Sequence, residues 1–97
     1  MKAVALIPAY NESGTIAEVI AGIRSQVDRI LVVDDGSTDA TSQLACEAGA
    51  EVIHRTQNGG KGLAVRAGLD RVLQDSFTHV LMIDADLQHK PEEAEAL

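Results

Sequence analysis

The stretch RILVVDDGSTDAT, residues 29–41, shows the pattern that decides the fold of the chain. Its unbroken apolar run, residues 30–33, is typical of a strand that is buried on both faces of a sheet. Two aspartates and a glycine follow, and such residues form tight turns. Residues 37–39 are Ser, Thr and Asp, which commonly cap the start of a helix. The stretch therefore predicts a strand, a turn and a helix in succession.

The same unit recurs on both sides of this stretch. Apolar runs predict further strands, and apolar residues at helical spacing predict the helices between them. Thr15 and Glu18 form a capping-box pattern. The predicted strands are residues 3–8, 29–35, 50–55 and 79–85, and the predicted helices are residues 15–26, about 37–48 and 60–75. This alternation predicts an α/β fold: a parallel sheet of about four strands with helices on both faces and right-handed crossovers.

The composition excludes several classes of protein. The chain has 97 residues and a formal net charge of −7, so we expect a single domain that does not use nucleic acid or an anionic membrane surface as its main partner. No apolar run approaches the roughly 20 residues of a membrane-spanning helix. The single cysteine, Cys46, excludes an internal disulfide and is expected to be a buried thiol on a helix. These features indicate a cytoplasmic setting.

Unusual polar residues gather where the predicted strands end. Because the carboxyl ends of parallel strands share one edge of a sheet, we expect all of these residues to lie together, where open α/β sheets bind ligands. In chain order the four clusters are Pro8, Tyr10, Asn11 and Glu12; Asp34 and Asp35; Asn58, Gly59, Gly60 and Lys61; and Asp84, Asp86, Gln88 and His89.

Asp84 and Asp86 are two residues apart directly after an apolar run. Alternate side chains of an extended segment point the same way, so both carboxylates can approach one metal ion. Hard cations such as magnesium and manganese prefer oxygen ligands and often retain phosphate oxygens as further ligands. The structural alternative is a pair of solvated acids or a helix cap. His89, just beyond the pair, is a candidate additional ligand.

The other two clusters each allow two interpretations. Asp34 and Asp35 either belong to an ordinary Asp-Gly-Ser turn, or one of them accepts a hydrogen bond from a nucleobase or a sugar hydroxyl. The NGGKG sequence, residues 58–62, is either a flexible turn or a site where backbone N–H groups approach a ligand closely, with Lys61 and Arg66 supplying positive charge. The spacing of its glycines differs from that of a Walker loop.

Taken in order, four segments resemble the first half of the family 2 glycosyltransferases, and among these most resemble the dolichol- and polyprenol-phosphate sugar synthases. The segments are IPAYNE, VVDDGSTDAT, NGGKGLAVRAGL and DADLQHKPE. The resemblance spans nearly the whole chain. It implies a Rossmann-like N-terminal half of a GT-A fold, and transfer of a sugar, with inversion, from a nucleoside diphosphate (UDP or GDP) to an acceptor such as a polyprenyl phosphate.

The resemblance also implies roles for individual residues. Asp84 and Asp86 would bind Mg²⁺ or Mn²⁺ and, through it, the diphosphate. Asp34 or Asp35 would contact the base, with Asp35 the first choice. The nucleotide-binding set implied in this way is Pro8, Ala9, Tyr10, Glu12, Asp34, Asp35, Lys61, Asp84, Ala85, Asp86 and Gln88. The catalytic base is expected beyond Leu97, so residues 1–97 are expected to be the N-terminal, nucleotide-binding part of a longer enzyme.

Two other functions remain open from the sequence. The chain could be a metal- and nucleotide-binding module without catalysis of its own. A phosphatase with Asp84 as nucleophile is disfavoured, because Leu87 and Gln88 follow where a small hydroxyl residue would be expected. An isolated part of an enzyme would also expose sheet edge or apolar helix surface, so it is expected to form homodimers. The longer protein is expected in the cytoplasm, at the cytoplasmic face of a membrane.

Overall fold

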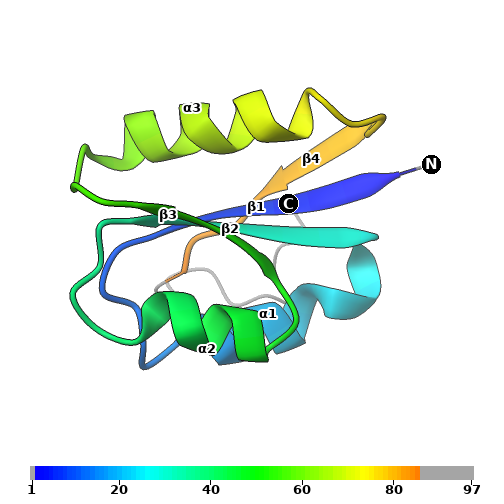
Figure 1. The fold of residues 1–97 in the computed structure, drawn as a ribbon. Coiled ribbons are helices and arrows are strands. Elements are labelled where there is room, and N and C mark those ends of the chain that lie inside the picture. The colour runs from blue at the N-terminus through cyan, green and yellow to red at the C-terminus, as the bar shows by residue number, and fades with distance from the viewer. Residues whose placement is uncertain (1, 86–97) are drawn as a thin grey trace.

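The computed structural model describes residues 2–85, and it has a single sheet with helices on both faces (Figure 1). The elements in chain order are β1 (Ala3–Ala9), α1 (Ile16–Ile23), a 3₁₀ turn η1 (Arg24–Gln26), β2 (Arg29–Asp35), α2 (Thr41–Glu47), β3 (Glu51–Arg55), α3 (Lys61–Val72) and β4 (His79–Met82). Asp86, Gln88, His89 and the helix predicted from Pro91 lie outside the described residues. The predicted order of strands and helices is confirmed up to β4.

The four strands are parallel and lie in the order β3-β2-β1-β4. The chain builds outward from β1 to β3 and then crosses over to place β4 on the other side of β1. The order therefore reverses between β1 and β4, which creates the type of crevice where ligands bind in open α/β sheets. Helices α1 and α2 cover one face of the sheet, and α3 covers the other (Figure 1).

The two central strands carry the core. β1 and β2 are buried almost throughout, because their alternate side chains pack against opposite layers of helices. Ile7 and Val32 pack against α1, whose buried residues recur at helical spacing, while Leu6 and Val33 pack on the side of α3. Their continuous apolar runs are explained by this two-sided burial. β4 differs, since all four of its residues are exposed.

Helix α3 lies unusually close to the sheet at Gly68. A Cβ atom at this position would be 2.3 Å from Leu6 Cδ1 and 2.9 Å from Val33 Cγ2, distances too short for any side chain to occupy. The helix begins at Lys61, so the close packing at Gly68 also fixes how near that end of the helix lies to the sheet.

β4 is shorter than predicted, and Pro8 explains where it ends. The N–H groups of His79 and Ile83 donate to the carbonyl oxygens of Lys2 and Leu6. The backbone N–H and C=O groups of the even-numbered residues of β1 therefore point toward β4. The next bond of this ladder would run from the nitrogen of Pro8 to the carbonyl of Ile83. Because proline has no N–H, the ladder stops there, whereas the pairing of β1 with β2 continues to Ala9 and Asp34.

Three local predictions are wrong. Thr15 is the N-cap residue of α1, but its side chain makes no capping bond; the carbonyl of Glu12 accepts the N–H groups of Thr15 and Ile16 instead. Helix α2 begins at Thr41, and Asp39 accepts the N–H of Thr41 without itself being the N-cap residue. Cys46 lies on the predicted helix, but its thiol is exposed because it is on the side of α2 away from the sheet.

Candidate functional site

A pocket of about 300 Å³ opens at the carboxyl edge of the sheet, beside the point where the strand order reverses. The carboxyl end of each strand, or the loop that follows it, contributes to the pocket, so described members of all four polar clusters meet at one edge, as predicted. Its lining residues are Pro8, Ala9, Tyr10, Glu12, Asp35, Asn58, Gly60, Lys61, Ala64, Asp84 and Ala85. Asn58, Gly60 and Ala64 were not among the predicted nucleotide-binding residues. The NGGKG sequence signalled the first two, whereas Ala64 gave no sequence signal.

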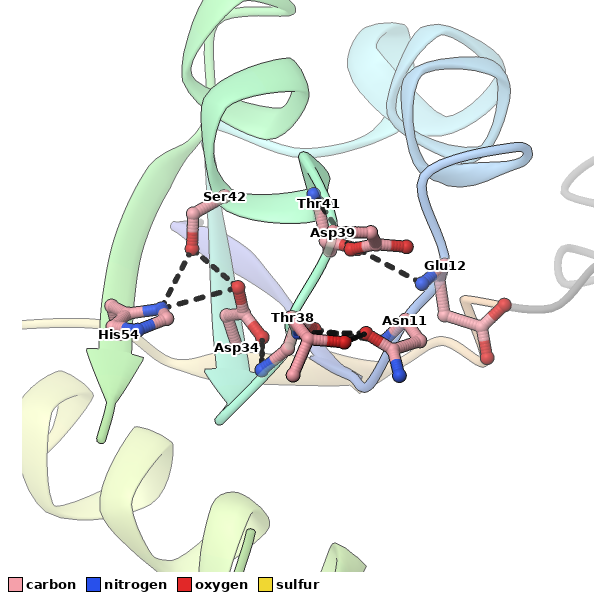
Figure 2. Close-up of polar contacts among 9 residues, drawn as sticks. Asn11, Glu12, Asp34, Thr38, Asp39, Thr41, Ser42 and His54 are labelled. Carbon is pink, nitrogen blue, oxygen red and sulfur yellow. Dashed lines mark hydrogen bonds and ion pairs between the residues drawn. The ribbon is translucent and has the colours of Figure 1, made fainter. Parts of the chain in front are cut away.

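The structure distinguishes the two adjacent aspartates at the end of β2. Asp34 is not part of the pocket wall, and its side chain is buried, with only 1% exposed. Its carboxylate accepts the N–H of Ser37 at 3.0 Å and the hydroxyl of Ser42, and it lies 3.2 Å from Nδ1 of His54 (Figure 2). Burial alone would raise the pKa of Asp34, but these hydrogen bonds outweigh it and hold the pKa below its ordinary value. Asp34 therefore anchors the turn that leads into α2.

Asp35 forms part of the pocket wall and is 3% exposed. Its Oδ1 accepts a hydrogen bond from Nη1 of Arg55 at 2.6 Å. The N–H of Gly59 is shared between both carboxylate oxygens, at 3.2 and 3.1 Å, and the N–H of Gly60 donates to Oδ2 at 2.8 Å. Gly60 has a φ of +93°, which only glycine adopts without strain. The carboxylate of Asp35 thus holds the glycine turn immediately before Lys61.

Lys61 and Asp84 face each other across the pocket. Nζ of Lys61 lies 2.8 Å from Oδ1 of Asp84, and both side chains remain partly exposed. Within residues 2–85, no group of three or more His, Cys, Asp or Glu side chains is arranged to hold a metal ion. Asp84 nevertheless offers the hard oxygen ligand that magnesium and manganese prefer, at an accessible position beside a cation that suits phosphate oxygens. Asp86, the other predicted ligand, and Gln88 lie outside the described residues.

The loops after β1 and β2 are joined by a network of hydrogen bonds (Figure 2). Asn11 has a φ of +52°; its N–H donates to Oγ of Ser37 at 2.7 Å, and its Oδ1 accepts the N–H of Thr38 at 2.9 Å. The N–H of Glu12 donates to the hydroxyl of Thr41 at 2.9 Å, and this hydroxyl in turn donates to Asp39. The network holds Glu12 at the pocket. The part that Thr41 plays in this network was not predicted, because a hydroxyl at the start of a helix has no distinctive sequence signal.

Arg66, the other charged residue predicted to serve this site, contributes less to the pocket than Lys61. Arg66 is exposed on α3 and is not part of the pocket wall, so the prediction that it supplies charge there is wrong; it lies more than a helical turn beyond Lys61.

Among residues 2–85, no helix is long and apolar enough to cross a membrane.

Solved structures share this fold. The chain superimposes with a TM-score of 0.72, at 34% sequence identity, on glucosyl-3-phosphoglycerate synthase from Mycobacterium tuberculosis, crystallised with Mn²⁺, UDP and glucosyl-3-phosphoglycerate. The match covers 87% of this chain and 33% of that one. The fold is therefore the GT-A fold of glycosyltransferases, as predicted, over the part that the chain covers.

The sequence comparisons agree with the structural ones. Residues 4–97 match the family described as Glycosyl transferase family 2, and the chain belongs to this family. It is 47% identical over 83 residues to glycosyltransferase AglJ of Haloferax volcanii, and 37% identical over 100 residues to polyprenol monophosphomannose synthase of Mycolicibacterium smegmatis. These matches cover 84% and 95% of this chain but only 26% and 38% of the two relatives.

Proposed function

We propose that residues 1–97 form the N-terminal, nucleotide-binding part of a glycosyltransferase that binds a nucleoside diphosphate sugar with a divalent metal ion. The observation that carries this proposal is the pocket at the reversal of strand order, which brings Asp35, Lys61 and Asp84 together. The family membership of the chain and the Mn²⁺ and UDP bound to the M. tuberculosis synthase support the same assignment.

Asp35 is the residue proposed to contact the base. A carboxylate has about four lone-pair sites. Three donors already occupy it, namely Arg55 and the N–H groups of Gly59 and Gly60, which leaves room for one further N–H. Uracil and guanine each present such an N–H, so the geometry is compatible with UDP and with GDP. Pro8, Ala9 and Tyr10 would form the apolar wall beside the nucleoside.

The diphosphate is proposed to lie between Lys61 and Asp84. The chain is strongly acidic, so a second anion beside Asp84 requires a cation, and Lys61 alone supplies one charge. Mg²⁺ or Mn²⁺ held by Asp84 and Asp86 would supply the remaining charge and stabilise the leaving nucleotide as a Lewis acid. Ala85 and Gln88 would lie beside the metal-bound phosphates, and Lys61 would turn from Asp84 toward a phosphate oxygen.

The acceptor and the stereochemistry are proposed from the relatives. Polyprenol monophosphomannose synthase is 37% identical to this chain, which favours a polyprenyl phosphate acceptor. We propose that an enzyme with such a lipid acceptor works at the cytoplasmic face of a membrane. Inversion at the anomeric carbon would require a general base, which we place beyond Leu97. The 97 residues alone are therefore expected to bind nucleotide without transferring sugar.

The test is calorimetry of the chain with UDP and with GDP, in the presence and absence of Mn²⁺. We expect Mn²⁺ to strengthen nucleotide binding, and Asp84→Asn to weaken the Mn²⁺-dependent binding by about a hundredfold, since it removes the charge of a metal ligand. The matched control is Asp70→Asn, an equal charge change on the exposed side of α3. Equal affinities with and without Mn²⁺ would contradict the proposal, and metal-independent phosphate release would favour the phosphatase.

Self-association of the chain is also proposed. The edge strand β4 exposes Val80, Leu81 and Met82, and an exposed apolar edge strand pairs readily with another strand. A homodimer that dissociates when Leu81→Lys is introduced, measured by light scattering, is the expected result.

A further inference from the structure

Among residues 2–85, no strand pairs with the segment that carries Asp84. The ladder between β1 and β4 makes its last bond from Ile83 to Leu6, and the missing N–H of Pro8 ends it there. Asp84 and Ala85 therefore lie beyond the regular sheet, although Ala85 is buried. The backbone of this segment needs another contact to fix it, because a buried carbonyl without a donor is unfavourable.

The hydroxyl of Thr15 provides that contact. Its Oγ1 lies 2.5 Å from the carbonyl oxygen of Ala85, whereas the main-chain oxygen and Oε2 of Glu12 lie at 3.5 and 3.4 Å. A hydroxyl has a single hydrogen to donate, and all three neighbours are acceptors, so the short distance places the hydrogen on the bond to Ala85. Thr15 and Ala85 are 70 residues apart in the chain.

The start of α1 does not need this hydroxyl. The carbonyl of Glu12 accepts the N–H groups of Thr15 and Ile16 at 3.1 and 2.9 Å, and the side chain of Thr15 makes no capping bond. The hydroxyl that the sequence assigned to a capping box is thus used for a contact between two loops of the pocket. Removing it leaves the first turn of the helix intact and removes a donor from Ala85.

We propose that Thr15 is a positioning residue for the metal-binding segment: its bond to the carbonyl of Ala85 replaces the sheet ladder that Pro8 interrupts, and so fixes Asp84 at the pocket. This inference rests on the proposed function, in which Asp84 holds the metal ion. Asp84 is then held from two directions, by Lys61 through its carboxylate and by Thr15 through the backbone of the following residue. Ordering these groups before the ligand arrives strengthens binding.

Variants that differ by the hydroxyl test the proposal. Thr15→Val keeps the branched shape and removes the donor, and Thr15→Ser keeps the donor in a smaller side chain. The control, Thr78→Val, removes a similar hydroxyl that donates to the carbonyl of Lys2 at 3.0 Å, at the other end of the same strand pair. The readouts are the Mn²⁺ affinity of each variant with UDP, followed by electron paramagnetic resonance, UDP affinity without metal, and amide hydrogen exchange at residues 83–85.

We expect Thr15→Val to weaken Mn²⁺ binding by about five- to tenfold, the loss of one hydrogen bond, and to speed exchange at residues 83–85. The affinity for UDP without metal should change less than about twofold, which is less than the loss of one hydrogen bond would cause. Thr15→Ser should bind Mn²⁺ nearly as the wild type does, and Thr78→Val should not alter Mn²⁺ binding.

Three outcomes would overturn the inference. Unchanged Mn²⁺ affinity in Thr15→Val would show that the hydroxyl does not position Asp84. Equal weakening in Thr15→Val and Thr15→Ser would assign the effect to packing. If Thr15→Val does not fold, Thr15→Ala and Thr15→Ser, which differ only in the hydroxyl, replace the pair, and equal Mn²⁺ affinities there also contradict the proposal. Absence of Mn²⁺-dependent UDP binding in the wild-type chain would instead overturn the proposed function itself.

Discussion

The two edges of the sheet hold their charged groups in different ways. At the amino edge, Arg29 binds Glu51 through two hydrogen bonds of 2.5 and 2.6 Å and binds Asp75 at 2.8 Å, and its guanidinium lies 4.9 Å from the centre of the Phe77 ring. These side chains are all partly exposed. At the carboxyl edge, Asp34 and Asp35 are buried, and their partners include three backbone N–H groups of loops, from Ser37, Gly59 and Gly60.

The difference indicates what each edge contributes. Charged side chains at the amino edge neutralise one another in solvent, where ion pairs add little to stability. At the carboxyl edge, each buried carboxylate is tolerated because several donors satisfy it, and those donors come from β3, from α2 and from the loops after β2 and β3. The carboxylates at the carboxyl edge therefore hold the turns at that edge, with Asp35 in the pocket wall, whereas those at the amino edge join the ends of neighbouring strands.

The largest expected effect is at the carboxyl edge. Arg55→Met would leave the carboxylate of Asp35 buried without its cation, and we expect a loss of about 2–4 kcal/mol in the free energy of unfolding. Urea denaturation followed by circular dichroism measures this loss. Arg66→Met is the matched control, because Arg66 is exposed on α3, and it should be nearly neutral. Similar losses in the two variants would contradict the comparison between buried and exposed charges.

A smaller effect is expected from pH. Burial raises the pKa of Asp34, but its hydrogen bonds to Ser37, Ser42 and His54 lower it more, so the folded pKa lies below the ordinary value of 3.8. A group with a lowered folded pKa stabilises the protein fully above its unfolded pKa and loses that contribution as pH falls through the folded pKa. Stability should therefore decline below about pH 4.

Asp34→Asn sharpens this test, because the amide does not titrate. Urea denaturation at pH 6 and pH 3 should show a shallower pH dependence in the variant than in the wild type. The remaining slope would come from Asp39, Glu51 and Asp75, whose pKa values are lowered by hydrogen bonds from Thr41, Arg29 and Arg29 respectively. Identical slopes in the two proteins would show that Asp34 contributes nothing to the acid sensitivity.

The smallest effect is expected at the amino edge. Arg29→Met keeps the contact of an unbranched side chain with Phe77 but removes the ion pairs with Glu51 and Asp75. We expect a smaller loss of stability than in Arg55→Met, and one that shrinks further in 1 M NaCl, where the screening length is about 3 Å. Thermal unfolding at low and high salt provides the measurement, and a loss exceeding that of Arg55→Met would reverse the comparison.

Much of the fold was predictable because its signals are local. The buried strands β1 and β2 are continuous apolar runs, Asp35 stands out as an acid at the end of such a run, and Lys61 stands out as a cation after paired glycines. The end of β4 was not predictable, since it depends on which side of β1 the nitrogen of Pro8 faces. The role of Thr15 was missed for a similar reason, because its partner is far away in sequence and a local capping pattern offered a simpler explanation.

The absence of a side chain at Gly68 affects the wall of the pocket as well as the packing of the core. Any larger residue there would have to displace the side chains of Leu6 and Val33 or the helix itself, and the same helix begins at Lys61, which pairs with Asp84. Packing about two helical turns away therefore bears on the position of Lys61, so a substitution at Gly68 tests the core and the wall of the pocket together.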